Sequence, residues 1–228
     1  MRTSVYLLCI CLCCHLLTAQ HTDFEFVDFT RADNIAKLNL EAELDNLPLL
    51  AHKLTYKLPS QVEQFRAIYT WVCLSIKGDM SLQRKVDEHR LKFKNDSTAF
   101  LKWNYEFKKL AFKKLLKQKK TMCTGYAYLI KELCYLAQIE CVIVDGYGRS
   151  VRSNIKELEM ANHSWNAVKL NTKWYLCDAT WSSGYMNAYS IFIQDYNEGY
   201  FLTTPSLFGK NHFPLEKKWC FYGKPKML

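Results

Sequence analysis

Three residues in the middle of the chain have the side-chain types that activate a thiol nucleophile. Cys123 opens a helical pattern, while His163 and Asp178 lie on two consecutive strand-like segments. A cysteine attacks as its thiolate, an imidazole takes up the thiol proton, and a carboxylate orients the imidazole. A single cysteine at a helix start is more often structural, but the three types in this order indicate a candidate site for nucleophilic catalysis.

A short hairpin would bring the histidine and the aspartate together. The strand-like segments 163–170 and 173–180 are separated only by Asn171-Thr172. If these two residues form the turn, His163 and Asp178 become diagonal neighbours on one face of the hairpin. Diagonal neighbours lie about 7–8 Å apart at the backbone, which is near enough for their side chains to hydrogen-bond. A loop that changed the pairing parity would put them on opposite faces.

The start of a helix is a favourable place for a reactive cysteine. Apolar residues recur at helical spacing over 123–137, so Cys123 would lie beside the unpaired N–H groups of the first turn. Those groups stabilise a thiolate and can hold the oxyanion of a tetrahedral intermediate. We expect Gly125, Tyr126, Trp165 and Trp181 to line the site. This chemistry requires neither a metal nor another cofactor.

The N-terminal half has mainly helical patterns. Ser60 with Glu63 is a capping box ahead of an amphipathic helix. The remaining expectations are an extended lead-in over 23–29, a helix capped by Asp33 that ends near Pro48, a loop or short helix over 78–97, and a helix over 99–120.

The C-terminal half has mainly strand patterns. Strands are expected over 139–148, 163–170 and 173–180, with a charged surface loop over 149–160 and a short strand over 200–203. A layer of helices followed by a mostly antiparallel sheet predicts an α+β domain. We expect one domain over 20–228, with a lead-in over 20–59 and the core over 60–228.

The first nineteen residues have the pattern of a secretory signal peptide. Arg2 precedes an uncharged, mainly apolar run over 5–17, and Ala19 is a small residue just before a cut ahead of Gln20. No later segment approaches the ~20 consecutive apolar residues of a membrane span. The sequence therefore predicts an exported protein, periplasmic or secreted. Cleavage would remove Arg2 and lower the formal net charge from +9 to +8.

The cysteines outside this leader could form disulfides or remain free thiols. They are Cys73, Cys123, Cys134, Cys141, Cys177 and Cys220. Export makes disulfides possible, and a bridged Cys123 would exclude catalysis. The spacing contains no C-x-x-C pair, so a zinc site is poorly supported. We expect most of these cysteines to be small buried hydrophobes.

A run of lysines carries much of the positive charge. Residues 102–120 contain eight lysines and the single acid Glu106. Such a run is usually a solvated helix face, and the alternative is attraction to an anionic surface of the cell envelope. Nucleic acid is not an expected partner, because no binding motif accompanies the charge.

Several sequence blocks together resemble the transglutaminase-like superfamily. Three carry the chemistry: Cys123-x-Gly125-Tyr126-Ala127, then Asn-His-Ser-Trp-Asn-Ala-Val over 162–168, then Lys-Trp-Tyr-Leu-Cys-Asp-Ala-Thr-Trp over 173–181. The blocks 65–72, 200–205 and 211–214 are also similar to this family. The strongest likeness is to its kyphoscoliosis-peptidase and cytokinesis-type branch, which is common in exported bacterial proteins. It covers about 62–219.

The resemblance implies a papain-like α+β fold, with Cys123 as the nucleophile, His163 as the base and Asp178 as the orienting carboxylate. It implies acyl transfer from an amide of a protein or peptide, through a thioester that water or an amine resolves. The alternative is a module that keeps the fold for binding or structure on the cell envelope.

Two features next to the expected site do not follow the family pattern. The residues 74–79 read Leu-Ser-Ile-Lys-Gly-Asp where the family has Asn-Ile-x-Tyr-Asp. The side chain that would complete the oxyanion site is also not evident. Trp103 is a candidate for it, but a core aromatic role fits Trp103 better.

Overall fold

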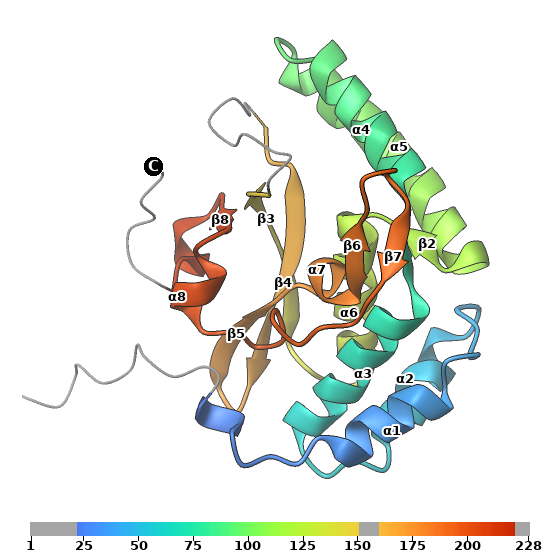
Figure 1. Cartoon of the computed structure of the whole chain (residues 1–228), viewed down its shortest axis with the longest axis vertical. Coiled ribbons are helices and arrows are strands. Elements are labelled where there is room, and N and C mark those ends of the chain that lie inside the picture. Colours follow the sequence, from blue (N-terminus) through green and yellow to red (C-terminus); the bar gives the residue numbers. More distant parts are fainter. Residues whose placement is uncertain (1–21, 151–159, 222–228) are drawn as a thin grey trace, which may run out of the picture.

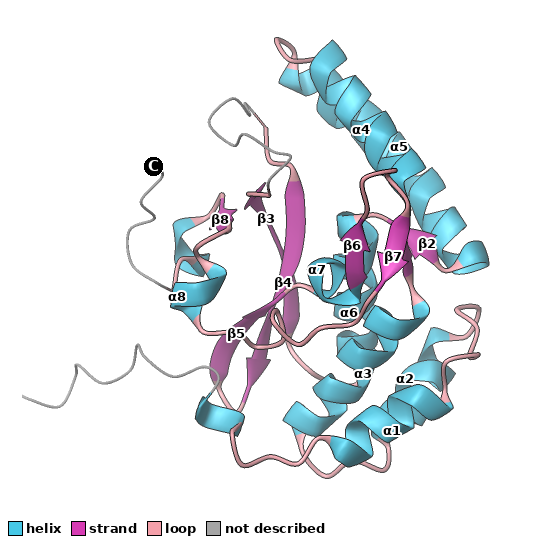
Figure 2. Ribbon diagram, in the orientation of Figure 1, coloured by secondary structure: helices cyan, strands magenta, loops and turns pink. Residues whose placement is uncertain are grey.

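Helices and a four-stranded antiparallel sheet form the main layers of the chain (Figures 1 and 2). The computed structural model describes residues 22–150 and 160–221. The helices are α1 (Thr30–Leu38), α2 (Leu47–Thr55), α3 (Gln61–Ser75), α4 (Met80–Lys92), α5 (Ser97–Gln118), α6 (Cys123–Leu136), α7 (Ala179–Ser183) and α8 (Pro205–Phe208). The strands are β1 (Lys77–Gly78), β2 (Lys120–Thr121), β3 (Cys141–Gly148), β4 (His163–Leu170), β5 (Lys173–Cys177), β6 (Gly184–Met186), β7 (Phe192–Gln194) and β8 (His212–Pro214).

Strand β4 lies inside the main sheet, whose strand order is β5-β4-β3-β8. All three strand pairs are antiparallel. Nearly every residue of β4 is buried, because both faces of the sheet are covered. On one face Asn166 donates a hydrogen bond to the carbonyl of Ala127 in α6 (2.9 Å). On the other face Trp165 packs with Phe208 of α8.

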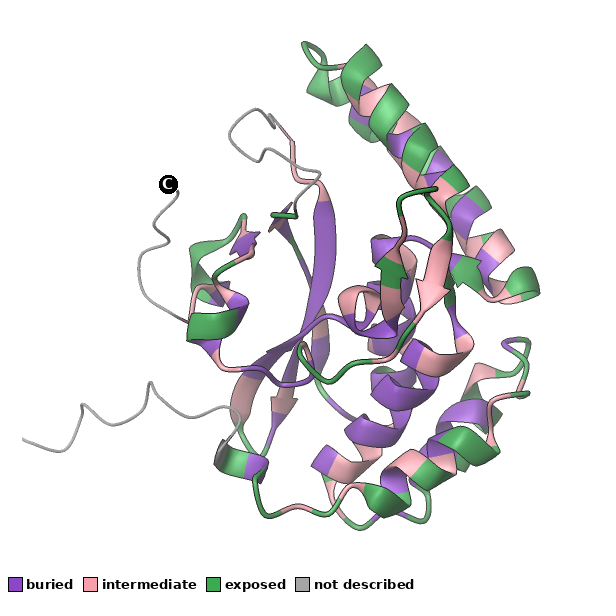
Figure 3. Ribbon diagram, in the orientation of Figure 1, coloured by how far each residue is buried: buried purple, intermediate pink, exposed green. Residues whose placement is uncertain are grey.

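The largest hydrophobic cluster lies between the helices and the first face of the sheet. Helix α3 supplies more of its buried residues than any other element, and α1, α2, α6, the strands of the hairpin and several loops also contribute. Figure 3 shows this buried centre along α3, α6 and β4, with exposed residues gathered on α4, α5 and the outer helix faces. The predicted α+β fold, with helices packed on a mostly antiparallel sheet, is confirmed.

The N-terminal residues differ from the prediction. The extended lead-in was a wrong prediction, because Thr22–Phe24 is a turn of 3-10 helix, and the Phe24 ring packs on Tyr175 (5.1 Å). The single helix expected up to Pro48 is two helices, α1 and α2. Asp33 lies in the first turn of α1 instead of capping it, and its carboxylate pairs with the buried Arg66 of α3.

The next helices follow the sequence signals more closely. Ser60 caps α3 and accepts a hydrogen bond from the amide of Glu63 (3.3 Å). The segment predicted as a loop or short helix contains the 13-residue helix α4. It packs against α5 through a small cluster that includes Leu82, Val86 and Phe107.

The lysines of α5 point mostly to solvent. Lys102, Lys108, Lys109, Lys113 and Lys117 are exposed, as expected for a solvated helix face. Attraction of this run to an anionic surface stays a prediction. Among the described residues, none of the helices has the length and hydropathy that crossing a bilayer requires.

The hairpin of β4 and β5 has the predicted register. Leu170 pairs with Lys173 and Asn166 with Cys177, and both turn residues, Asn171 and Thr172, have positive φ. A two-residue turn with both residues in the left-handed region matches the twist of the flanking strands. Strand β5 ends at Cys177, three residues earlier than predicted, because Asp178 caps α7.

The last part of the prediction is partly wrong and partly outside the described residues. Residues 200–202 form a turn and bends, and residue 203 is irregular, so no strand is present at 200–203. Leu202 has a positive φ of 47°, which an extended strand cannot accommodate. The signal peptide predicted over 1–19 lies outside the described residues, as does most of the loop predicted over 149–160.

Candidate active site

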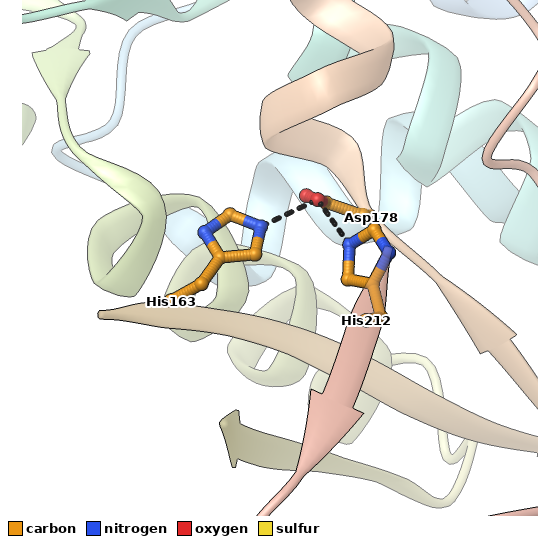
Figure 4. Close-up of side chains that lie close together, drawn as sticks. All are labelled: His163, Asp178 and His212. Atoms are coloured by element: carbon orange, nitrogen blue, oxygen red, sulfur yellow. Dashed lines mark hydrogen bonds and ion pairs between the residues drawn. The ribbon is translucent and has the colours of Figure 1, made fainter. Parts of the chain in front are cut away.

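A buried carboxylate lies between two imidazole rings at the end of the β4–β5 hairpin (Figure 4). His163 Nε2 is 2.7 Å from Asp178 Oδ2, and His212 Nε2 is 3.1 Å from the same oxygen. Asp178 and His212 are fully buried, and His163 is 8% exposed. The same-face arrangement predicted for His163 and Asp178 is therefore present.

Asp178 is held by its position at the start of α7. As the N-cap it accepts hydrogen bonds through Oδ1 from the amides of Thr180 (2.8 Å) and Trp181 (3.3 Å). Its own amide donates to the Tyr200 carbonyl (3.1 Å). Aspartate is a preferred N-cap residue because its carboxylate satisfies amides that the helix leaves unpaired. This anchoring leaves Oδ2 directed at the two histidines.

His163 is the first residue of β4, and closely packed neighbours hold its ring. Trp181 stacks on the ring with a centroid distance of 5.0 Å. On β3, a Cβ added at Gly148 would lie 3.0 Å from three atoms of the His163 side chain. The side chain can be this close to β3 only because residue 148 is glycine.

Cys123 is the first residue of α6, as predicted. The preceding residue, Met122, contributes no side-chain cap, and its carbonyl accepts the amides of Gly125 (2.9 Å) and Tyr126 (3.2 Å). The amides of Cys123 and Thr124 are therefore the ones that this helix start offers to other acceptors. The His163 side chain and the Ser164 backbone lie near enough to the sulfur to lower the pKa of Cys123. Helix α6 packs against β4, and this packing places the predicted nucleophile and base near each other.

The electrostatics of these groups favour a thiolate–imidazolium pair. Burial alone would raise the pKa of Cys123, but the hydrogen bond and charge of His163 and the Ser164 backbone outweigh it, so the pKa is lowered. Burial would lower the pKa of His163, but the Asp178 charge and the hydrogen bonds to Asp178 and Cys123 raise it to about 10. Despite burial, the two histidines hold the pKa of Asp178 well below its usual range.

The other cysteines differ from Cys123. Burial raises the pKa of Cys73, Cys134 and Cys177 well above that of an ordinary thiol. Among the six cysteines of the described residues, Cys123 carries a free thiol, so the alternative of a bridged Cys123 is wrong. Five of the six are buried, as expected of small hydrophobic side chains.

The four residues expected to line the site have different positions. Trp181 is partly exposed and stacks on His163, and Trp165 is buried beside His163 and His212. Tyr126 lies in the main core, where its hydroxyl donates to the Ile76 carbonyl (2.8 Å). Gly125 packs against Thr121, whose Oγ1 would lie 1.9 Å from an added Cβ.

Trp103 and the segment 74–79 have structural positions. Trp103 packs with the small cluster of α4 and α5 and stacks on Phe107 (4.8 Å), as expected for a core aromatic. Residues 77–78 form β1, which pairs in parallel with β2 just before α6.

Sequence reasoning missed His212 as part of the site. The block Asn211-His212-Phe213-Pro214 contributed to the family resemblance, but no role followed from it. The feature of the sequence that could have indicated His212 was a histidine within a short apolar segment. Because His212 lies 34 residues from Asp178, only the pairing of β8 with β3 shows that the two side chains meet.

The same three residues offer donor atoms that a metal could use. One atom each from His163, Asp178 and His212 lies within 4.8 Å of the others. Both imidazole nitrogens are, however, in direct hydrogen-bond contact with the carboxylate oxygen. Metal–nitrogen bonds of ~2.0–2.1 Å would have to replace both contacts. We interpret the cluster as a hydrogen-bonded network.

Comparison with known proteins identifies the family of the chain. A family model described as the transglutaminase-like superfamily matches residues 49–179, more than half of the chain. The chain belongs to the transglutaminase-like superfamily. The matched residues include Cys123, His163 and Asp178 and end before His212.

Within this transglutaminase-like superfamily the chain is similar to curated animal proteins. It is 32% identical to human kyphoscoliosis peptidase over 208 residues, which is 90% of this chain and 28% of that protein. It is 23% identical to hillarin of Drosophila melanogaster over 216 residues, which is 89% of this chain and 24% of hillarin. A solved structure titled as a TGase is 15% identical, with a TM-score of 0.40, and covers 81% of this chain and 41% of that one. The chain thus spans about a quarter of the length of these curated relatives.

Proposed function

We propose that the chain is a cysteine-dependent acyl-transfer enzyme that acts on an amide bond of a protein or peptide. In this proposal Cys123 is the nucleophile, His163 is the general acid and base, and Asp178 orients His163. The observation that carries it is the hydrogen-bonded pair of His163 with the buried Asp178, placed beside Cys123 so that His163 lowers the pKa of this thiol. Each residue has a pKa shifted toward the charge that its role requires.

The first half of the reaction forms a thioester. The Cys123 thiolate attacks the amide carbonyl carbon, and the developing oxyanion accepts hydrogen bonds from backbone N–H groups at the start of α6. The tetrahedral intermediate collapses as the C–N bond breaks, and the His163 imidazolium gives its proton to the leaving amine. This leaves an acyl group on sulfur and a neutral imidazole that still donates to Asp178.

The second half releases the acyl group. His163 takes a proton from water or from a second amine as that molecule attacks the thioester carbonyl. Collapse of this intermediate returns the thiolate and the imidazolium, and the product is a free acid or a new amide. Membership of the transglutaminase-like superfamily and similarity to a protein named as a peptidase support both outcomes.

Selective alkylation tests the nucleophile. The whole protein is treated with limiting iodoacetamide at pH 7, and each cysteine-containing peptide is quantified by mass spectrometry. We expect Cys123 to be modified faster than Cys73, Cys134 and Cys177. The Cys123→Ala variant should lose this fast phase, and the matched control Cys73→Ala should keep it. If Cys123 reacts as slowly as the buried cysteines, the enzyme proposal fails and the binding or structural module is favoured.

A further inference from the structure

A second histidine hydrogen-bonds to the same carboxylate oxygen as the proposed base. His212 Nε2 lies 3.1 Å from Asp178 Oδ2, and His163 Nε2 lies 2.7 Å from it. The other oxygen, Oδ1, accepts the two amides of α7. Thus two backbone donors fix one oxygen of the carboxylate. Figure 4 shows the two imidazoles that share the other oxygen.

Hydrogen-bond chemistry determines which ring atoms carry protons. An ionised carboxylate only accepts hydrogen bonds. Asp178 is ionised, because its donors hold its pKa below the usual range. Each nitrogen that faces it must therefore bear a hydrogen, so both His163 and His212 donate through Nε2–H. The two donors compete for the same oxygen.

The fold holds His212 in this position. Its ring is fully buried and stacks on Phe208 (4.0 Å). Nδ1 is 2.7 Å from Asn211 Oδ1, and the Asn211 amide donates to the Tyr200 hydroxyl (2.9 Å). When Nδ1 of His212 carries a proton, it can donate to the Asn211 side-chain oxygen. When Nδ1 is unprotonated, it can accept from the Asn211 side-chain nitrogen after the amide rotates by 180°. Asn211 can therefore hold His212 in its neutral or its charged form. Pairing of β8 with β3 fixes the backbone of this segment.

We propose that His212 is a positioning residue that aims Asp178 at His163 and limits how tightly the carboxylate holds the His163 Nε2 proton. The inference rests on the proposed function, because it concerns the acid and base of that reaction. A carboxylate oxygen that accepts two N–H donors is a weaker acceptor for each of them. His163 can then keep its orientation and still deliver its other ring proton to a leaving amine.

The charged and titratable neighbours of His212 are few. Asp178 faces it from the start of α7, and His163 faces it from β4 across the shared oxygen. The Tyr200 hydroxyl is connected to it through Asn211. The rings of Trp165, Trp181 and Phe208, which carry no charge, also contact it. The carboxylate of Asp178 is therefore the partner through which His212 acts.

Imidazole N–H signals in proton NMR report these hydrogen bonds directly. In the whole protein with 15N-labelled histidine, we expect N–H resonances downfield of the backbone amides from the Nε2–H of each histidine, in addition to the Nδ1–H of the His163 imidazolium. His212→Phe should remove one of them. It should also shift the His163 resonance further downfield, because Asp178 then has a single imidazole donor. His212→Gln restores an N–H near the position of Nε2, so it should return the His163 resonance close to its wild-type position.

Further variants separate this role from a purely structural one. Asn211→Leu removes the support of the ring while keeping His212, and should broaden or shift the His212 resonance. Replacing the exposed His52 with Gln is the matched control and should change neither resonance. Circular dichroism checks that each variant is folded. If His212→Phe fails to fold, His212→Gln and Asn211→Leu still carry the test.

The possible failures are distinguishable. If the His163 resonance is unchanged in His212→Phe, or shifts equally in His212→Gln, His212 does not share the carboxylate as proposed. If Cys123 is not selectively alkylated in the wild-type chain, the proposed function fails whatever the histidine resonances show. Fast alkylation of Cys123 with an unchanged His163 resonance overturns only the role of His212.

Discussion

Replacing Asp178 with Asn separates the charge of the carboxylate from its structural role. Asparagine is also a preferred N-cap, so its side-chain oxygen can still accept the amides of Thr180 and Trp181. Its amide nitrogen would then face the two imidazoles and donate to them. His163 Nε2 would have to accept, which places the ring proton on Nδ1, the nitrogen needed to take the proton of Cys123.

The expected loss follows from the acidity of the thiol. Without the Asp178 charge, burial lowers the pKa of His163 from its raised value near 10, and the ring is neutral at pH 7. Cys123 then loses its imidazolium partner, and its pKa rises at least to the ordinary 9.0. A thiol with that pKa is ionised to about 1% at pH 7, so alkylation should slow about 100-fold relative to a fully ionised thiol.

The assay is the rate of iodoacetamide modification of Cys123 between pH 5 and 9, measured peptide by peptide. Asp23→Asn is the matched control, because Asp23 also accepts side-chain hydrogen bonds, from Lys173 and Tyr175, but does not contact the site residues. The control should keep the wild-type rate even if it unfolds at a lower temperature. A folded Asp178→Asn chain that is alkylated within threefold of the wild-type rate would refute the reasoning.

Three further outcomes are expected. Gly125→Ala should lower the free energy of unfolding by about 1–3 kcal/mol, because the new Cβ would lie 1.9 Å from Thr121 Oγ1. Urea denaturation measures this loss, and unchanged stability would show that the start of α6 can shift. Stability should also fall in acid. Burial lowers the pKa of His212 below its ordinary 6.5, so below that pH the unfolded chain binds a proton that the folded chain excludes. The pKa of Asp178 lies below its ordinary 3.8, so its contribution is present above that pH and declines below it. His212→Gln should remove the loss of stability that protonation of His212 causes, which is measured as the urea midpoint between pH 4 and 7. If the variant and the wild type lose stability equally over this pH range, His212 is not the cause. Finally, the chain expressed in a secreting host should be exported and begin at Gln20, and N-terminal sequencing that finds Met1 on exported protein would contradict the proposed signal peptide.

The pairing of His163 with Asp178 was predictable because its determinants are local. The two-residue turn at Asn171-Thr172 fixes the parity of the hairpin, and parity alone decides whether His163 and Asp178 share a face. The start of α6 was similarly evident, since apolar residues recur at helical spacing from Cys123 onward. These features depend on residues that are close in sequence, and periodicity detects such features well.

The features that were missed depend on tertiary contacts. Helix α4 has few apolar residues, and only packing of Leu82 and Val86 against α5 shows its buried face. Residues 200–203 have a strand-like composition, but the backbone carbonyl of Tyr200 accepts hydrogen bonds from Tyr69 and Asp178 instead of pairing in a sheet. The contact of His212 with Asp178 requires β8 to lie beside β3.

The separation of the site residues along the chain has a consequence for biosynthesis. Cys123 leaves the ribosome before β4 and the start of α7, so in the growing chain it is an ordinary, weakly acidic thiol. In the proposed function, its reactivity would arise only when the β4–β5 hairpin docks against α6. The proposed nucleophile would then stay weakly reactive until the residues that activate it have been synthesised. Because this reactivity would depend on docking of the hairpin, the rate of Cys123 alkylation during refolding would measure when the hairpin docks against α6.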